Sequence, residues 1–428
     1  MKWQVVRLDG VLEALESGSR PPGGSRAVQT GVPSLGGEHL DDDGGFRLEA
    51  IKYIPESHYA AMTQGAVHPY DILLVKDGAT TGKTSLVRDD FPFEQAAVNE
   101  HVFIVRVNPD LADSRYVFYF LFSPRGKAEI LRDHRGATIG GISRAFASQV
   151  RLPLPPPSEQ RRIVEILDQA DRLCRLRAEA DAKADRILPA LFINMFGDPA
   201  TNPMGWPMKP LGDLTEHLTS GSRGWSKYTG RGPAYFLRTQ DINDGEIAEN
   251  LLHVDPPDGA EAERTRLAVG DVAITITGIV GKAAMCRGHD RPVYVSQHVA
   301  LVRPKADELC SEYLAAYANL PLEDVPVLAR FQYGQTKPGL GFQELRTARI
   351  LLPPLERQRA FAKHVNAAQI YRHAGTAASK VLAALWTSLL SRAFSGDLTG
   401  SWREAHTKEL LQEIERQAKA LAAVGPVE

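Results

Sequence analysis

The sequence contains few cysteines, no long apolar run and no strong excess of charge of either sign. Its three cysteines, Cys174, Cys286 and Cys310, lie far apart and form no CxxC pair, which argues against a disulfide scaffold or a zinc knuckle. No stretch approaches the ~18 apolar residues of a membrane span, and the N-terminus lacks the apolar segment of a signal peptide. The sequence therefore predicts a soluble, cytoplasmic protein that does not associate with membranes.

The charge balance limits how the chain can bind nucleic acid. Its 50 basic and 52 acidic residues give a formal net charge of −2, so bulk attraction to a polyanion is excluded. Any nucleic-acid surface must be a local cluster of Lys and Arg, or be completed by a partner. The 428 residues, 43% of them hydrophobic, suffice for two or three packed domains.

The chain consists of two copies of one unit about 200 residues apart. Ser17-Gly18-Ser19-Arg20 recurs as Ser220-Gly221-Ser222-Arg223, and Val98-Asn99-Glu100-His101 recurs as Val295-Ser296-Gln297-His298. Asp71-Ile72 followed by Gly82-Lys83 recurs as Asp271-Val272 followed by Gly281-Lys282, and Pro155-Pro156 with Gln160-Arg161 recurs as Pro353-Pro354 with Gln358-Arg359. Because the matches keep their order over ~190 residues, they indicate domain duplication.

Each copy begins with about 150 residues of mixed structure. Residues 72–75 and 102–105, with their counterparts 273–276 and 299–302, are short apolar runs typical of buried strands. Residues 116–121 and 313–317 are expected to be short helices. We predict an α+β fold with mixed domains at 1–152 and 205–350.

Each copy ends in a long predicted helix, at 153–197 and 351–397. Apolar residues recur at alternating spacings of three and four, which predicts an antiparallel coiled coil, and Pro189 should kink or end the first helix. An alternative is that both are core helices of one large domain. A helical tail is expected at 398–428. The residues predicted to pack between helices or against a partner are Ile163, Ile166, Leu173, Ile187, Leu191, Phe361, Tyr371, Leu382, Leu385 and Leu389.

The sequence resembles the specificity subunits of Type I restriction-modification enzymes over nearly its whole length, to about residue 397. The resemblance rests on Leu152-Pro-Leu-Pro-Pro-Pro-Ser-Glu-Gln-Arg-Arg-Ile-Val at the start of the first helix and on Ile350-Leu-Leu-Pro-Pro-Leu-Glu-Arg-Gln-Arg-Ala-Phe at the second. The second copy departs from the family pattern, because Arg357 replaces the Glu before Gln358.

The resemblance implies a non-catalytic DNA-recognition subunit. Its two target-recognition domains would each read one half of a split, asymmetric DNA site. Its helices would fix the gap and dock two methyltransferase subunits, joined by restriction subunits in a full assembly. No cofactor is expected in this chain; S-adenosylmethionine, ATP and Mg²⁺ are expected on the partner subunits.

DNA-contact candidates come from the polar loops of both copies. Arg can read guanine or hold phosphate, and Gln can read adenine. Glu38 and Gln240 occupy corresponding sites but differ, as two readers of different targets should. The candidates are Ser19, Arg20, Thr81, Lys83, Asn99, Arg135, Thr138, Arg144, Ser222, Arg223, Arg238, Gln240, Lys282, Ser296, Gln335 and Lys337.

Two other functions remain open from the residues alone. Asp77-Gly78-Ala-Thr-Thr-Gly82-Lys83-Thr84 nearly spells a P-loop, which would make the chain a nucleotide-binding protein with a coiled-coil arm. Asp77 stands where the first glycine should be, however. The chain could also be a helical scaffold that never touches DNA. His101 and His298 have no other ligands at metal spacing, and no catalytic set is found.

Overall fold

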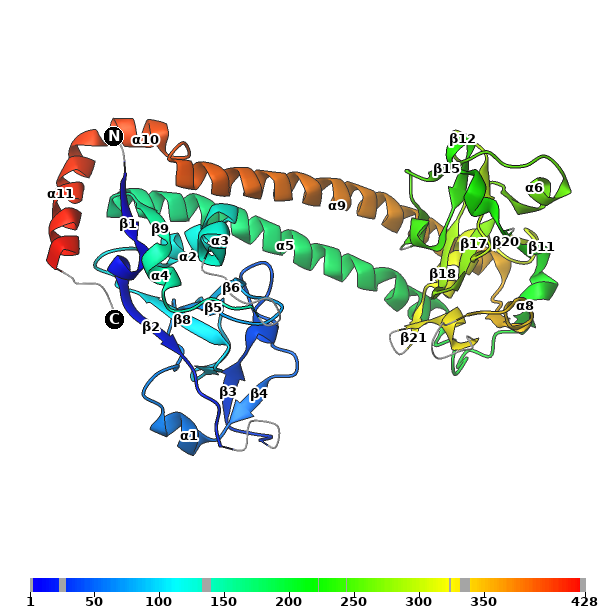
Figure 1. Cartoon of the computed structure of the whole chain (residues 1–428). Coiled ribbons are helices and arrows are strands. Elements are labelled where there is room, and N and C mark those ends of the chain that lie inside the picture. Colours follow the sequence, from blue (N-terminus) through cyan, green and yellow to red (C-terminus); the bar gives the residue numbers. More distant parts are fainter. Residues whose placement is uncertain are drawn as a thin grey trace. The chain divides into compact units, whose positions relative to one another are not determined.

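The computed structural model describes residues 3–22, 28–132, 140–221, 223–243, 245–322, 325–331 and 339–423. The chain forms two compact units. Unit 1 comprises Met1–Leu176 and Ser379–Glu428, and unit 2 comprises Arg177–Ala378. Each unit joins a domain of helices and strands to part of two long helices, α5 (Pro157–Phe196) and α9 (Leu355–Ser395) (Figure 1). The predicted α+β class with two repeated domains and two long helices is confirmed.

The domain of unit 1 is built on an antiparallel sheet of order β2-β8-β5-β6. Its strands are β2 (Leu12–Ser17), β8 (Val102–Val107), β5 (Ile72–Val75) and β6 (Thr84–Leu86). A second sheet holds β4 (Lys52–Ile54), β3 (Val32–Leu35) and β7 (Ala97–Val98), and β1 (Gln4–Arg7) pairs with β9 (Arg151–Leu154). The helices before α5 are α1 (Glu56–Ala61), α2 (Ser114–Phe122), α3 (Pro124–Leu131) and α4 (Phe146–Gln149).

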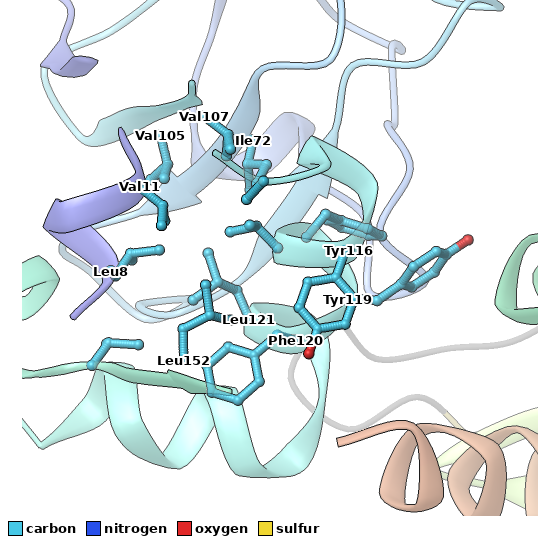
Figure 2. Close-up of a cluster of buried hydrophobic side chains, with 14 of the residues drawn as sticks. Leu8, Val11, Ile72, Val105, Val107, Tyr116, Tyr119, Phe120, Leu121 and Leu152 are labelled. Atoms are coloured by element: carbon cyan, nitrogen blue, oxygen red, sulfur yellow. The ribbon is translucent and has the colours of Figure 1, made fainter. Parts of the chain in front are cut away.

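Helix α2 supplies much of the core of unit 1. Asp113 caps the helix by accepting the backbone N–H groups of Arg115 and Tyr116, as expected for an N-cap carboxylate. All six residues from Tyr116 to Leu121 are buried, and Figure 2 shows Tyr116, Phe120 and Leu121 directed into the cluster formed with the strands. The short helices predicted at 116–121 and 313–317 are both present.

The domain of unit 2 repeats this plan. Its antiparallel sheet has the order β11-β20-β17-β18, with β11 (Thr215–Ser220), β20 (Val299–Pro304), β17 (Val272–Thr277) and β18 (Ile279–Met285). A second sheet contains β15 (Leu252–Val254), β12 (Thr229–Leu237), β19 (Val293–Val295) and β16 (Arg266–Leu267), and β10 (Met208–Pro210) pairs with β23 (Arg349–Leu351). The short pairs are β13 (Ile242–Asn243) with β14 (Glu246–Ile247), and β21 (Pro321–Leu322) with β22 (Val325–Pro326). Its helices are α6 (Ala260–Thr265), α7 (Ser311–Ala318) and α8 (Phe342–Thr347).

The same long-range contacts recur in both units. Arg106 makes a bidentate pair with buried Asp71, at 2.9 and 2.8 Å. Arg303 does the same with Asp271, at 2.7 and 2.8 Å. In both, the aspartate also accepts the backbone N–H of the residue three positions earlier. These pairs, which the sequence repeat did not single out, fix the turn before the central strand.

Helix α5 begins in unit 1 and ends in unit 2, and α9 does the reverse. In unit 2 the end of α5 meets the start of α9, where the Phe192 and Phe361 rings lie 5.5 Å apart. In unit 1 the end of α9 packs near the start of α5, since Phe394, Ile163 and Leu167 share one buried cluster. The helices are therefore antiparallel within each unit, as predicted.

The packed stripe differs from the predicted seam at four of its ten named positions. Ile163 and Phe361 are fully buried, and Ile166, Leu191, Leu382 and Leu389 are partly buried. Leu173, Ile187, Tyr371 and Leu385 are 46–57% exposed. Their next neighbours in sequence, Cys174, Leu188, Arg372 and Trp386, are the less exposed residues. The stripe thus follows the 3.6-residue period of a straight helix more closely than a strict heptad would.

Pro189 was expected to kink or end the first helix; α5 runs through Pro189 to Phe196, so it does not end there. The last turn is held by the Phe192 and Phe196 rings, which are fully buried against Tyr313 and Phe361. This burial compensates for the backbone hydrogen bond that proline cannot donate.

The C-terminal tail forms α10 (Gly400–Ala405) and α11 (Thr407–Ala423) and packs within unit 1. Glu413 accepts hydrogen bonds from the backbone N–H and the hydroxyl of Ser158, at 2.9 and 2.8 Å. Ser158 lies inside the first turn of α5 and donates to the tail. Gln417 donates to the carbonyls of Leu111 and Pro155. The tail therefore covers the start of α5.

Candidate nucleic-acid interface

The predicted DNA-contact loops of unit 1 lie at one end of its sheet, which we call loop edge 1. Ser17, at the end of β2, is opposite Phe103, at the start of β8, and Val75, at the end of β5, is opposite Val102. Antiparallel pairing thus brings the segments 18–20, 76–83 and 99–101 to the same end. Residues 140–142 join them, since the Ile142 N–H donates to Lys76 O at 2.7 Å.

A close backbone contact explains the recurring Ser-Gly-Ser motif. A Cβ atom on Gly18 would lie 1.5 Å from the Val98 carbonyl oxygen, and one on Gly221 would lie 1.8 Å from that of Val295. Only glycine permits this approach. The absence of a side chain at these glycines therefore allows two loops of the edge to pack closely. In unit 1 these are Ser17–Arg20 and Val98–Glu100.

Several candidates of unit 1 are exposed or half-buried and already hold local partners. The Arg20 guanidinium lies 2.5 Å from Glu100 and its side chain is 64% exposed. Ser19 Oγ lies 3.3 Å from His58 Nε2. The Thr81 hydroxyl donates to Gly78 O, and Asn99 Oδ1 accepts the N–H of His101. Arg144, also exposed, donates to Gln64.

Lys83 is less available than the sequence suggested. Its side chain is only 16% exposed, and its ammonium lies 2.9 Å from Asp42. This hydrogen bond lowers the pKa of the Asp42 carboxyl below its ordinary value. Any phosphate held by Lys83 would have to compete with that carboxylate.

Sequence reasoning considered His101 but missed the acidic groups that surround it at loop edge 1. His101 Nδ1 lies 2.5 Å from Asp77, and His101 Nε2 lies 3.4 Å from Glu100. Glu100 thereby links Arg20 to His101. The recurring His in both copies was the available signal, because an exposed His next to acidic residues belongs to a polar network.

Unit 2 has an equivalent loop edge 2, at which β11, β17 and β20 place Gly221, Arg223 and the segment 296–298 together with Thr277. Gly339 bridges to Thr277 as Gly141 bridges to Asp77. Arg223 and Gln240 are exposed. The predicted residues Ser222, Gln335 and Lys337, and Arg135 and Thr138 of unit 1, lie outside the described residues.

Three predicted contacts of unit 2 have positions that do not favour direct DNA contact. Arg238 makes a bidentate pair with Asp241, both bonds at 2.9 Å, and this raises the pKa of the guanidinium. Ser296 is 5% exposed, and its hydroxyl finds no hydrogen-bond partner within the described part of the chain. Lys282 lies within β18 and donates to Asn243 at 3.1 Å, so it is not in the tight loop predicted for it.

Arg238 marks a turn that both copies build with different residues. In unit 2, Asp241 accepts the Arg238 N–H at 2.9 Å; in unit 1, His39 Nδ1 accepts the Gly36 N–H at 2.9 Å. Gln240 lies within the turn 238–241 and Glu38 within the turn 36–39, and both are exposed. Glu38 lies 2.5 Å from Lys52. The same backbone turn thus presents different polar side chains in the two copies.

The near P-loop is a β-hairpin turn. Residues 76–83 join β5 to β6, with Gly78 at φ 94° and Gly82 at φ 86°. A P-loop needs a helix immediately after the lysine, because the helix N-terminus binds the phosphates. Here strand β6 follows instead. The structure therefore does not favour the nucleotide-binding alternative.

The start of each long helix is tied to its domain by one buried glutamine. Gln160 accepts the Asp113 N–H at 2.9 Å and donates to Pro155 O at 2.8 Å. Gln358 accepts the Cys310 N–H at 2.9 Å and donates to Pro353 O at 2.8 Å. Both are at most 1% exposed. The Pro-Pro…Gln motif therefore fixes each domain to its helix.

Arg357 stands where the first copy has Glu159, and both helix starts nevertheless place an arginine beside a tryptophan. In unit 1, buried Glu159 accepts hydrogen bonds from Trp3, Thr399 and Arg403, and the Arg403 guanidinium lies 5.0 Å from the Trp3 ring centre. In unit 2, Arg357 replaces the glutamate and itself lies 5.4 Å from the Trp206 ring centre. Each helix start thus keeps an Arg–Trp contact.

Comparison with known proteins agrees with this duplicated arrangement. Residues 1–184 match the family described as the Type I restriction modification DNA specificity domain. This match covers the first domain and the first part of α5, and the chain is similar to Type I specificity subunits beyond it. Among the described residues, none of the helices is long and apolar enough to span a bilayer, and no group of three or more His, Cys, Asp or Glu side chains is placed to hold a metal.

Relatives of known name cover most of the chain. The Type I restriction enzyme EcoBI specificity subunit of Escherichia coli is 24% identical over 389 residues, covering 82% of this chain and 77% of the relative. The EcoKI specificity subunit of Escherichia coli strain K12 is 22% identical, covering 84% and 81%. The Type I restriction-modification S subunit from M. genitalium has the same fold, with a TM-score of 0.53 at 15% identity, covering 92% of this chain and 96% of that one.

Proposed function

We propose that the chain is a Type I specificity subunit that reads a bipartite DNA site, with the domain of each unit contacting one half-site. The observation that supports this most directly is the pair of loop edges. The Asp–Arg pair, the close glycine and the buried glutamine recur in both units, whereas the side chains presented between them differ. Two domains that share one backbone arrangement but present different side chains are suited to two different half-sites.

The contacts to DNA are proposed for polar residues of the loop edges that are exposed or, for Thr81 and Asn99, half-buried. Arg20, Ser19, Thr81, Asn99 and Arg144 would act in unit 1, and Arg223 and Gln240 in unit 2. Because Arg20 is paired with Glu100, DNA phosphate or a base edge would have to replace that carboxylate. Such an exchange favours weak binding by the isolated chain and stronger binding once partner subunits add positive charge.

The long helices are proposed to set the gap between half-sites and to dock two methyltransferase subunits. The exposed apolar side chains on α5 and α9 support this role. Leu173, Leu176, Val381 and Leu385 lie on the helices of unit 1, and Ile187, Ile370 and Tyr371 on those of unit 2, each 46–72% exposed. Apolar side chains gathered on long helices are typical of protein-binding surfaces.

The chain itself is proposed to be non-catalytic and to act in the cytoplasm. S-adenosylmethionine would be bound by the methyltransferase subunits, and ATP and Mg²⁺ by any restriction subunits. A scaffold that never touches DNA is the competing function, and the same experiment separates the two.

Methylome sequencing of cells expressing the chain with its methyltransferase partner tests this function. Arg20→Ala should relax or lose recognition of one half-site, and Arg223→Ala should affect only the other. Arg151→Ala and Arg349→Ala are matched controls, because these exposed arginines lie on β9 and β23, outside the sheets that carry the loops. Methylation unchanged by either loop variant, or altered equally in both halves, would contradict the two-reader proposal.

A further inference from the structure

A cavity of about 330 Å³ lies within unit 2, where the end of α5 and the start of α9 meet α7 and β18. Its apolar wall includes Leu188, Met285, Ala316, Phe361 and Val365. Its polar lining includes Lys282, Arg287, Asn319, Gln369 and Arg372. A cavity of this size, with an apolar wall and a few convergent polar groups, has the character of a small-ligand site.

The corresponding place in unit 1 is filled by three aromatic side chains. The Trp386 ring lies 5.8 Å from that of Tyr119 and 6.5 Å from that of Phe122; Tyr119 is the ring at the edge of the cluster in Figure 2. The repeat offsets of 198 and 197 place Leu188, Ala316 and Asn319 at the matching positions of unit 2. All three aromatic rings are therefore replaced by smaller side chains, and the space of an indole is left open.

The charge beside this space also differs between the copies. In unit 1, Asp171 forms ion pairs with Arg88 at 3.1 Å and with Arg175 at 2.6 Å. At the matching positions of unit 2, Arg287 donates to the amide oxygens of Gln369 and Asn366. A carboxylate has thus become an amide, while the arginine is kept.

The other charged side chains in the lining do not neutralise the positive charge of Arg287. Lys282 adds a second cation, whose partner Asn243 is neutral. Of the two carboxylates in the lining, Asp185 lies 3.1 Å from Arg372, and Glu312 accepts a hydrogen bond from the Cys310 thiol. A cation held by amide oxygens can still bind an anion.

We propose that this cavity binds an indole-sized aromatic ring that carries a carboxylate. The ring would lie against Leu188, Ala316 and Phe361, in the place that Trp386 takes in unit 1. The carboxylate would accept hydrogen bonds from Arg287 and Lys282. The same chemistry is offered by a free aromatic acid or by an aromatic residue flanked by acidic residues in a partner chain.

Calorimetric titration of the full chain with indole-3-propionate tests the site. Binding should be at least about 10-fold tighter than that of neutral indole, because a charge-assisted hydrogen bond contributes to the first and not to the second. Arg287→Gln should remove this preference and leave indole binding unchanged. Leu188→Trp with Ala316→Tyr should abolish binding of both compounds, because it rebuilds the aromatic filling of unit 1.

The matched control is Trp386→Leu, which opens the equivalent space in unit 1 beside an arginine already paired with Asp171. In a chain that also carries the two filling substitutions, it should bind indole without preferring the acid. A capped Asp-Trp-Asp peptide separates the two sources: tighter binding than indole-3-propionate indicates a partner chain, and weaker binding a free compound. Failure of the unmodified chain to bind either probe, or an unchanged preference in folded Arg287→Gln, would overturn the proposal.

Discussion

The buried glutamines at the helix starts allow a paired test of how each domain is fixed to its helix. Gln160→Met and Gln358→Met keep the shape of the side chain and remove its hydrogen bonds. In unit 1, the Asp113 N–H loses its acceptor, but Pro155 O keeps a second donor, Gln417, at 3.2 Å. Only the Asp113 N–H is left unsatisfied, which should lower the free energy of unfolding by about 1–3 kcal/mol.

The same change should cost more in unit 2. Gln358→Met leaves the Cys310 N–H without its acceptor, and Pro353 O and Glu308 O without the donor that Gln358 supplies. Since three groups are affected, we expect about 2–4 kcal/mol. The tail helix α11 thus accounts for the smaller effect expected in unit 1.

Hydrogen exchange followed by mass spectrometry measures the two effects separately. Gln160→Met should speed exchange in peptides covering 111–122, and Gln358→Met in peptides covering 309–318, each by roughly one to two orders of magnitude if local opening governs exchange. Gln169→Met is the control, because it makes the same chemical change at an exposed position of α5. Equal acceleration of both peptide sets by Gln160→Met, or an effect of Gln169→Met as large, would refute the reasoning.

Three further predictions concern single contacts. Gly18→Ala should lower the free energy of unfolding by about 1–3 kcal/mol in urea titration, because its Cβ would overlap the Val98 carbonyl. Gly10→Ala is the control, because a Cβ there meets nothing within 4 Å. Arg403→Ala should lower the free energy of unfolding by about 3–5 kcal/mol in the same titration, because it leaves buried Glu159 without its cation. Adding Glu159→Gln should recover most of that loss. Burial raises the pKa of the Cys310 thiol to about 11, so only about 0.1% is thiolate at pH 8; reaction with a thiol reagent at pH 8 should be far slower than that of an unfolded-chain control, and should quicken as the pH rises toward 11.

The sequence predicted the architecture because duplication is visible in local motifs. Pro-Pro…Gln, Ser-Gly-Ser and the Asp-Ile/Val strands each keep their offset, and each occupies an equivalent place in the two units. Short apolar runs and long periodic segments were correctly assigned to strands and helices for the same reason. What a local pattern cannot reveal is a partner distant in sequence, such as Glu159 with Arg403 or Asp71 with Arg106.

The site residues were harder to predict because polarity alone does not distinguish contact with DNA from contact within the protein. Arg238 was a candidate on its charge, yet Asp241 holds it in a turn. Lys282 matched Lys83 in sequence but lies within a strand. Four of the ten predicted seam residues are exposed because a strict heptad was assumed, whereas the packed residues follow a longer period.

The differences between the two copies carry as much information as their likeness. Where a contact holds the fold, as in Asp71–Arg106 and Asp271–Arg303, both copies keep the same pair. Where the copies diverge, the change is compensated locally: Arg357 takes over the place beside Trp206 that Arg403 occupies beside Trp3. The aromatic cluster of Tyr119, Phe122 and Trp386 is different, because its counterparts shrink together and the neighbouring carboxylate becomes an amide. Three lost rings and one lost negative charge at one place leave both space and positive charge, which is why we assign a ligand to unit 2 and none to unit 1.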